Sequence, residues 1–230
     1  MKLRRETVSE QCVQLLRDDI LERRRPPGTV VTEEAMAQEL GVSRPTVREV
    51  LNTLTVEGLL TRNRTTRALH VTRLGADTIR EIYRARRLLE AGGVTAFAGR
   101  EDGALGALAA ETEKLVSAIA SGDVRTITRQ DIRCHVELVA LVGSTDLTEF
   151  YAGLLAKLRL AMADVSVSES YDLVAMGEDH VKFVELMQSR RIEDARRFVL
   201  DRLNRAEMLL LASTRIDSDT CRRSANQSRP

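Results

Sequence analysis

Basic and hydroxyl side chains gather at the start of one expected helix, over residues 43–48. Ser43, Arg44, Thr46 and Arg48 carry donors that suit the phosphates and base edges of DNA. A helix that presents such groups in its first turns has the layout of a DNA recognition helix. The alternative is an ordinary surface helix. Apolar residues recur behind these donors at helical spacing and predict a face turned towards a core: Val47, Val50, Leu51 and Leu54.

The residues around this segment favour a helix-turn-helix. Gly41 can end a preceding short helix in a left-handed cap. Ser43 is a good N-cap for the next helix. Pro45 falls just inside that helix, where its missing N–H costs little.

A second group of residues has the chemistry of a metal site. Asp131 and His135 are four residues apart, so they share one face of a helix. His180 belongs to a later helix, and the chain has three histidines in all. A carboxylate and two imidazoles that converge inside a bundle form a divalent metal site. The alternative is a plain surface hydrogen bond between Asp131 and His135.

The sequence carries no catalytic motif of the common kinds. HExxH, GxSxG, a Walker loop and GxGxxG are all missing, so we expect no enzyme. Cys12, Cys134 and Cys221 are scattered, which indicates a reducing compartment. No apolar run approaches the ~20 residues of a membrane span, and the start lacks the apolar core of a signal peptide. We therefore expect a cytoplasmic protein without a membrane partner.

Three helices and a hairpin are expected over residues 1–73. The helices are predicted at 7–23, 33–40 and 44–57, and Val30–Val31 forms a short extended piece. Two short strands, at 59–62 and 68–72, are joined by a tip that carries Arg64 and Arg67. Together these elements predict a winged helix-turn-helix domain.

The remainder of the chain predicts an all-α domain. A linker is expected at 74–77, six helices at 78–213 and a disordered polar tail at 214–230. Aromatic residues make up only 3%, so Leu, Val and Ala must fill the core, which suits a helical bundle. The whole chain is therefore expected to be mainly α. Gly92 and Gly93 lower the intrinsic stability of the first of these helices, and close helix packing is one explanation.

Charge is distributed unevenly along the chain. The net charge is +1 overall, but residues 1–73 carry a net +3 and residues 74–230 a net −2. Residues 42–73 alone hold six arginines and two glutamates. A local basic patch favours nucleic acid more than the whole-chain charge does.

The chain resembles the GntR family of bacterial transcription regulators, in its FadR-like branch with an FCD-type helical effector domain. The six expected helices favour the VanR-like subgroup. The motifs that carry the resemblance are Pro27-Gly28, Leu40-Gly-Val-Ser-Arg44, Val47-Arg48-Glu49, Glu57-Gly-Leu59, Arg86-Arg-Leu-Leu-Glu90, Asp131-Ile-Arg-Cys-His135, His180 and Asp194-Ala-Arg-Arg-Phe-Val-Leu.

The resemblance implies a homodimer that binds a palindromic operator and responds to a small carboxylate effector. It implies DNA contacts at the recognition helix and effector contacts at Arg86. It also implies that Asp131, His135 and His180 are ligands of one divalent metal ion of the zinc or nickel class.

Two positions depart from the family pattern. The fourth metal ligand of the family is a histidine, and this chain has Arg202 at that position. A guanidinium stays protonated and does not ligate a cation. Either three protein ligands hold the metal, or the metal is lost and Arg202 binds an anionic effector. The wing tip, Asn63–Arg67, lacks the glycine that the family usually places there.

The sequence therefore predicts a bacterial, cytoplasmic transcription regulator that binds specific DNA sequences and acts most simply as a repressor. A metal-dependent helical enzyme fused to a DNA-binding module is one alternative. An architectural DNA-binding protein with a dimerisation bundle is the other. The expected burial of Arg86, Asp131, His135, His180 and Arg202 favours a ligand pocket, because burying them without a partner is expensive.

Overall fold

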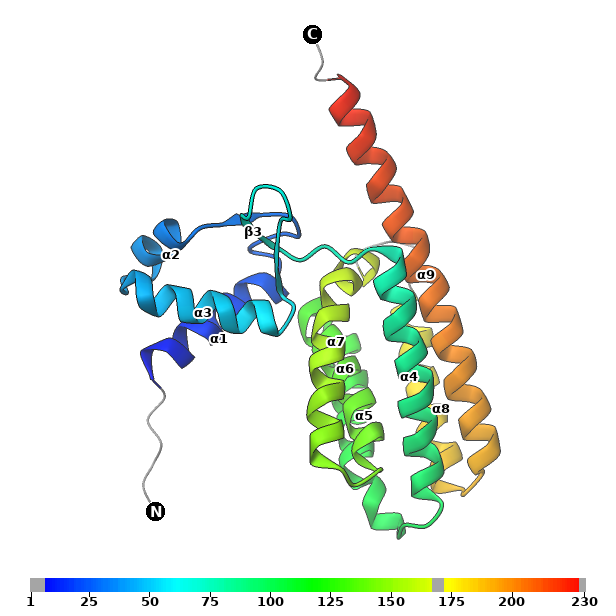
Figure 1. The fold of residues 1–230 in the computed structure, drawn as a ribbon. Helices are drawn as coiled ribbons and strands as arrows, with labels where there is room; N and C mark the ends of the chain where they lie inside the picture. The colour runs from blue at the N-terminus through cyan, green and yellow to red at the C-terminus, as the bar shows by residue number, and fades with distance from the viewer. Residues whose placement is uncertain (1–6, 167–171, 228–230) are drawn as a thin grey trace. The chain divides into compact units, whose positions relative to one another are not determined.

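The chain forms two compact units, Met1–Leu74 and Gly75–Pro230, termed here the N-terminal unit and the helical unit. A computed structural model describes residues 7–166 and 172–227. The N-terminal unit combines short helices with a small sheet, and the helical unit is a bundle (Figure 1). Each unit buries its own set of apolar side chains.

Three helices form the body of the N-terminal unit: α1 (Val8–Leu21), α2 (Glu33–Leu40) and α3 (Arg44–Val56). Gly41 ends α2 with a left-handed φ of 65°, and Ser43 accepts the backbone N–H of Thr46 at 3.3 Å to cap α3. Pro45 sits in the first turn of α3, as predicted. The apolar faces of the helices meet in a core that contains Leu16, Ile20, Val47, Val50, Leu51 and Leu54.

A three-stranded antiparallel sheet completes this unit, with strands β1 (Val30–Val31), β2 (Leu60–Arg62) and β3 (Leu69–Val71) in the order β1-β3-β2. The predicted hairpin is β2–β3, and the extended piece at Val30–Val31 pairs with its far edge. The winged helix-turn-helix expected from the sequence is therefore present.

The wing tip is closed without glycine. The side-chain oxygen of Asn63 accepts the backbone N–H groups of Thr65 and Thr66, at 2.8 and 2.9 Å. Arg67 adopts a φ of 60°, in the left-handed region that favours glycine. Asn63 thus supplies the turn by its own hydrogen bonds, while Arg67 holds the left-handed backbone conformation.

Six α-helices and one 3₁₀ turn form the helical unit within the described residues. They are α4 (Ala76–Phe97), η1 (Asp102–Leu105), α5 (Gly106–Ser121), α6 (Val124–Ala140), α7 (Thr145–Ser166), α8 (Leu173–Gln188) and α9 (Ile192–Gln227). The mainly α fold class and the six-helix bundle are confirmed. The break predicted near residues 167–170 lies outside the described residues.

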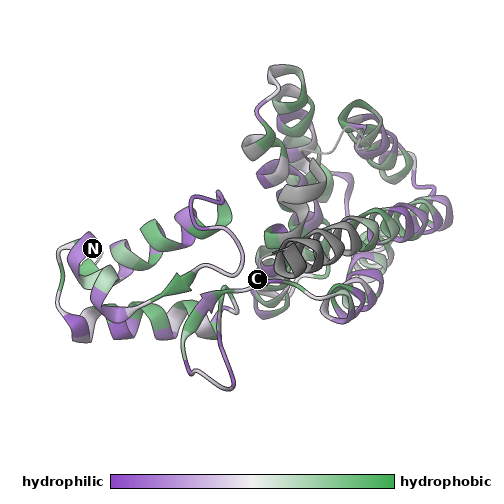
Figure 2. Ribbon diagram, turned by 90° about the horizontal axis from the view of Figure 1, so that it is seen from above, coloured by the Kyte–Doolittle hydropathy of each residue, from purple (hydrophilic) through white to green (hydrophobic). Residues whose placement is uncertain are grey.

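Leucine, valine and a few aromatic side chains fill the bundle core, among them Val94, Phe97, Leu115, Leu138 and Val199. Figure 2 shows hydrophobic and hydrophilic residues alternating along the helices, as expected of amphipathic elements.

Two boundaries differ from those expected. The linker was predicted at 74–77, but α4 begins at Ala76, with Gly75 at its N-cap. The tail was predicted to be disordered from residue 214, but α9 continues to Gln227 and projects past the beginning of α4 (Figure 1). Polar composition does not end a helix, and no glycine or proline interrupts the sequence between Ile192 and Gln227.

Helix packing accounts for Gly93 but not for Gly92. A Cβ added at Gly93 would lie 2.1 Å from the carbonyl oxygen of Leu138 on α6, whereas one added at Gly92 would meet nothing within 4 Å. Close approach of α4 and α6 therefore requires glycine at position 93 only. No helix within the described residues is long and apolar enough to cross a membrane.

The two glycines give a matched test of this close approach. Gly93→Ala should lower the free energy of unfolding by about 2 kcal/mol or more, because the added methyl group overpacks the contact. Gly92→Ala should raise it by about 1 kcal/mol through helix propensity. Urea unfolding followed by circular dichroism measures both changes. Shifts of the same sign in the two variants would show that α4 and α6 do not approach closely at Gly93.

Candidate functional site

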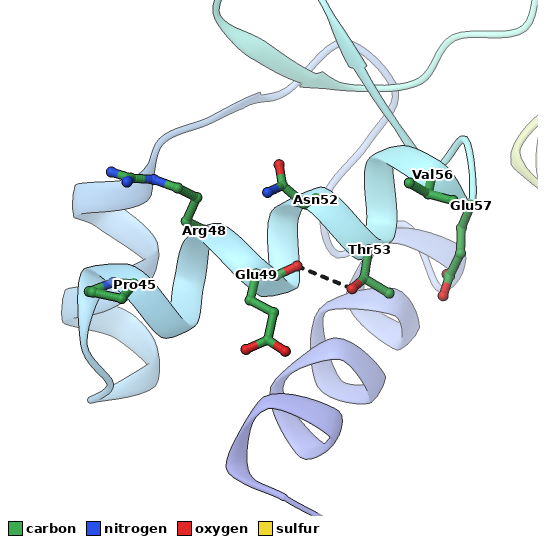
Figure 3. Close-up of a pocket in the computed structure, with 7 residues that line it drawn as sticks. All are labelled: Pro45, Arg48, Glu49, Asn52, Thr53, Val56 and Glu57. Atoms are coloured by element: carbon green, nitrogen blue, oxygen red, sulfur yellow. Dashed lines mark hydrogen bonds between the residues drawn. The ribbon is translucent and has the colours of Figure 1, made fainter.

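The outer face of α3 is a shallow depression lined by polar residues together with Pro45 and Val56. Figure 3 shows Pro45, Arg48 and Asn52 along this helix, with Val56 and Glu57 towards its end. Ser43, the N-cap, and Arg44, the first residue of the helix, are exposed, whereas Thr46 in the first turn is half-buried. The Ser43 hydroxyl is engaged with Thr46, at 2.9 Å from its Oγ1. The predicted DNA-contacting residues of α3 thus lie on the solvent side of the helix, opposite the core residues.

Both arginines of this face are paired with acids at the start of α2. Arg48 donates from Nε and Nη2 to the two carboxylate oxygens of Glu33, at 3.0 and 2.9 Å. Arg44 donates from Nη2 to Glu34 at 2.9 Å. All four side chains are substantially exposed. Exposed ion pairs contribute little to stability, and both guanidinium groups remain largely accessible to solvent beside their glutamates.

Arg64 and Arg67 lie at the exposed tip of the wing. The backbone carbonyl of Arg67 accepts Nη1 of Arg62 at 2.9 Å, which ties the tip to strand β2. The tip therefore presents basic groups on a closed turn.

The helical unit brings Asp131, His135 and His180 together in its interior. Asp131 and His135 come from α6 and His180 from α8, and all three are buried. Nε2 of His180 lies 3.2 Å from Oδ1 of Asp131, and Nε2 of His135 lies 3.7 Å from the same oxygen. One ligand atom from each residue falls within 4.8 Å of the others.

A second layer of this cluster centres on Glu90 of α4. Its carboxylate accepts Nε of Arg86 at 2.9 Å and the hydroxyl of Tyr151, on α7, at 2.5 Å. It also lies 2.7 Å from Nδ1 of His135. Arg86, predicted to converge on the Asp/His group, therefore reaches it through Glu90. The guanidinium of Arg86 also lies over the ring of Tyr83, 4.9 Å from the ring centroid.

Arg202 of α9 faces the same cluster. Its Nη2 lies 3.1 Å from Nε2 of His135, and its Nη1 is buried without a hydrogen-bond partner among the described residues. A guanidinium only donates, so Nε2 of His135 must accept. Nδ1 then carries the proton and donates it to Glu90.

The electrostatics of the cluster agree with this tautomer. Burial lowers the pKa of His135 to about 4, against the opposing influence of Glu90, so the ring is neutral near pH 7. Burial alone would raise the pKa of Asp131, but His135, His180 and Arg202 hold it below its usual range. The same opposition leaves the pKa of Glu90 below its usual range, because the effects of His135 and Arg86 exceed that of burial.

Three residues of the cluster, Asp131, His135 and His180, have side chains suited to bind a divalent cation. Nδ1 of His180 donates to the carbonyl of Met176 at 2.9 Å, so in the neutral ring the lone pair of Nε2 faces the Asp131 carboxylate. Two acceptors face to face suit a cation between them. The third ligand atom would be Nε2 of His135. Arg202 already donates a hydrogen bond to this atom and places a positive charge beside it. Arg86 and Arg202 also balance the charges of Glu90 and Asp131 without a metal.

Sequence reasoning gave no role to Glu90 or Tyr151. Glu90 lies four residues after Arg86, and this spacing together with its place on the apolar side of a helix was a usable signal of a buried pair. Tyr151 offered none, because a tyrosine among apolar residues is ordinary core.

Fold and site together define a DNA-binding regulator with a helical sensing domain. Residues 8–68 match the family model of bacterial regulatory proteins, gntR family, and residues 81–205 match the FCD domain. The chain belongs to the gntR family of bacterial regulatory proteins and carries an FCD domain. The resemblance stated from its motifs is confirmed, and the VanR-like subgroup stays a prediction.

Similar proteins extend over most of the chain. The Nta operon transcriptional regulator of Aminobacter aminovorans is 27% identical over 176 residues, which cover 76% of this chain and 80% of that protein. A GntR regulator structure from Rhodococcus sp. RHA1 has a TM-score of 0.79 and 23% identity over 89% of this chain and 97% of that one. The structure of E. coli McbR/YncC has a TM-score of 0.72 and 19% identity, over 91% and 100%. Both structures share the fold.

The buried Arg86–Glu90 pair gives a stability test. Arg86→Met should lower the free energy of unfolding by about 3–5 kcal/mol, because it leaves the Glu90 carboxylate without its counter-charge. The same substitution at the next residue, Arg87→Met, breaks a part-exposed pair with Glu207 and should change stability by less than about 1 kcal/mol.

Urea unfolding of a double-mutant cycle completes this test. Arg86→Met combined with Glu90→Gln should destabilise by less than the sum of the two single variants. Strict additivity would mean that the two charges do not interact.

Proposed function

We propose that this regulator is a homodimeric repressor that binds a palindromic operator and is controlled by a small carboxylate held in the helical unit. The observation that carries the effector assignment is the guanidinium of Arg202, which brings into a polar cluster a buried nitrogen that has no partner in the part of the chain that the structure describes. A buried donor of this kind is costly unless a ligand satisfies it.

Operator reading rests on α3 and the wing. Arg44 and Arg48 contact base edges, Ser43 and Thr46 contact the backbone near the helix start, and Arg64 and Arg67 contact phosphate or the minor groove. One chain has one such helix, so reading two half-sites of a palindrome requires two chains. The helical unit is the better dimer surface, because the small N-terminal unit must leave its basic face free.

The carboxylate effector is expected to bind Arg202 in a bidentate fork. Arg86 contributes through Glu90, whose carboxylate fixes the position of His135. A small monocarboxylate is the simplest class, because its one negative charge matches the guanidinium edge of Arg202 that has no partner among the described residues. The enzyme alternative is not favoured, since the family and the relatives are regulators. A purely architectural role is disfavoured by the buried polar cluster.

A divalent metal of the zinc or nickel class is expected to bind this cluster more weakly than it would bind a four-ligand site. Asp131, His135 and His180 would hold the ion, which would supply a Lewis-acid contact for the effector. Arg202 opposes it with a fixed positive charge next to one of the three donors.

Substitutions in α3 and the wing test the operator assignment. Arg44→Ala and Arg48→Ala should each weaken operator binding by about 1–3 kcal/mol with the fold intact, because each removes a base contact. Arg64→Ala should weaken all sequences alike and reduce the salt slope by about one. Fluorescence anisotropy at several salt concentrations measures both effects. Unchanged operator affinity in Arg44→Ala and Arg48→Ala would rule out this docking.

A thermal-shift screen tests the effector. Small carboxylates should raise the melting temperature of the wild-type chain with or without chelator, since a ligand at about 100 times its Kd adds about 2.7 kcal/mol. Arg202→Met should lose this response. Arg205→Met should keep it, because Arg205 is an exposed arginine that pairs with half-buried Asp179. A response that survives in Arg202→Met would place the acid elsewhere.

Arg202→His tests the metal. A fourth neutral ligand should raise zinc or nickel affinity by at least about tenfold in calorimetry, with Arg205→His as the control on the same helix. If the wild-type chain retains stoichiometric metal after dialysis against chelator, three protein ligands suffice and Arg202 does not weaken the site.

A further inference from the structure

The two ion pairs that face the outer side of α3 are not equivalent. Arg48 meets Glu33 edge to edge through two hydrogen bonds, from Nε and Nη2, at 3.0 and 2.9 Å. Arg44 meets Glu34 through one, from Nη2. Two parallel bonds fix the plane of a guanidinium, whereas one leaves it free to turn. Of these two arginines, Arg48 is therefore the more firmly oriented before DNA arrives.

The Glu33 contact leaves the DNA-binding end of Arg48 available. An arginine has five N–H donors, and Glu33 takes one on Nε and one on Nη2. The remaining donors include both on Nη1, and the side chain of Arg48 is 64% exposed. The free end of the guanidinium keeps the Nη1–Nη2 fork with which arginine reads the O6 and N7 atoms of guanine.

We propose that Glu33 is a positioning residue for sequence readout, which holds Arg48 in a fixed orientation so that its free end reads a guanine in the operator. The inference rests on the proposed operator binding. A flexible arginine loses rotamer freedom when it binds a base. An arginine already held by Glu33 has lost that freedom before binding. It also adapts less well to bases other than the one it is positioned for, and this favours the operator over other sequences.

Two features of Glu33 agree with this role. The hydrogen bonds from Arg48, with the charges of Arg44 and Arg62 nearby, hold the pKa of Glu33 below its usual range, so it stays ionised. As the first residue of α2, directly after the capping Thr32, it also lies where the helix dipole favours an acid. Its backbone is thus fixed at the point from which its side chain reaches Arg48.

The same helix position suggests two simpler roles, and they predict different results. If Glu33 only stabilised α2, its loss would lower the melting temperature and weaken all DNA binding together. If it were only a counter-charge, its loss would strengthen binding to every sequence, because a negative charge near the phosphates would be gone. A positioning role predicts that the affinity for the operator falls while the affinity for random DNA stays the same or rises.

The experiment compares two duplexes, one selected from a random-sequence library by the wild-type full-length chain and one of random sequence. Glu33→Gln should weaken the selected duplex about tenfold, as expected when part of the discrimination of a bidentate arginine is lost. It should leave the random duplex unchanged or bound about two- to threefold more tightly. Glu39→Gln is the control, because it makes the same charge change on the same helix but Glu39 pairs with Arg25, which lies outside α3. This variant should leave the ratio of the two affinities unchanged.

A double-mutant cycle connects the effect to Arg48. In an Arg48→Ala background, Glu33→Gln should no longer change the ratio of the two affinities. If Glu33→Gln changes the ratio as much in this background as in the wild type, the proposal is overturned. It is also overturned if Glu33→Gln alone changes the affinities for both duplexes in the same direction by the same factor. If the wild-type chain selects no sequence over random DNA, it is the proposed operator binding that fails.

Discussion

The carboxylate of Glu90 is the buried charge on which the helical unit depends. An anion in this interior is expensive unless charged and polar donors surround it, and here three elements supply them: Arg86 from α4, His135 from α6 and Tyr151 from α7. Satisfying one carboxylate therefore fixes the register of three helices. It also fixes the tautomer of His135, and hence which nitrogen of that ring faces Arg202.

Arginine–glutamate pairs appear in both units with opposite consequences. On α3 the pairs are exposed, so water and salt weaken them and either partner is able to separate from the other at little cost. In the bundle the Arg86–Glu90 pair is buried, so neither partner is able to leave without stranding the other. The same pair of residue types thus makes weak, solvated contacts on the surface of one unit and a permanent scaffold in the interior of the other.

Periodicity and capping residues were sufficient to predict most of the fold. Gly41, Ser43 and Pro45 specify the helix-turn-helix by local geometry, and the helices of the bundle follow from apolar spacing. The wing turn was not foreseen, because Asn63 closes it through side-chain bonds in place of the usual glycine. The length of α9 was missed because a polar segment without breakers is compatible with both coil and helix. In the buried cluster, the residues with metal-ligand chemistry were recognisable, whereas Glu90 and Tyr151 acquire their roles only from tertiary contact.

The missing side chain at Gly93 locks two helices of the bundle against each other. Where α4 and α6 touch, backbone meets backbone at Leu138, and no rotamer change is available to let one helix slide along the other. Arg86, Glu90, Asp131 and His135 therefore form a rigid wall of the site. His180 and Arg202 belong to two other helices, α8 and α9. If the proposed carboxylate binds Arg202, its first effect falls on α9, while the backbone contact at Gly93 keeps α4 and α6 together.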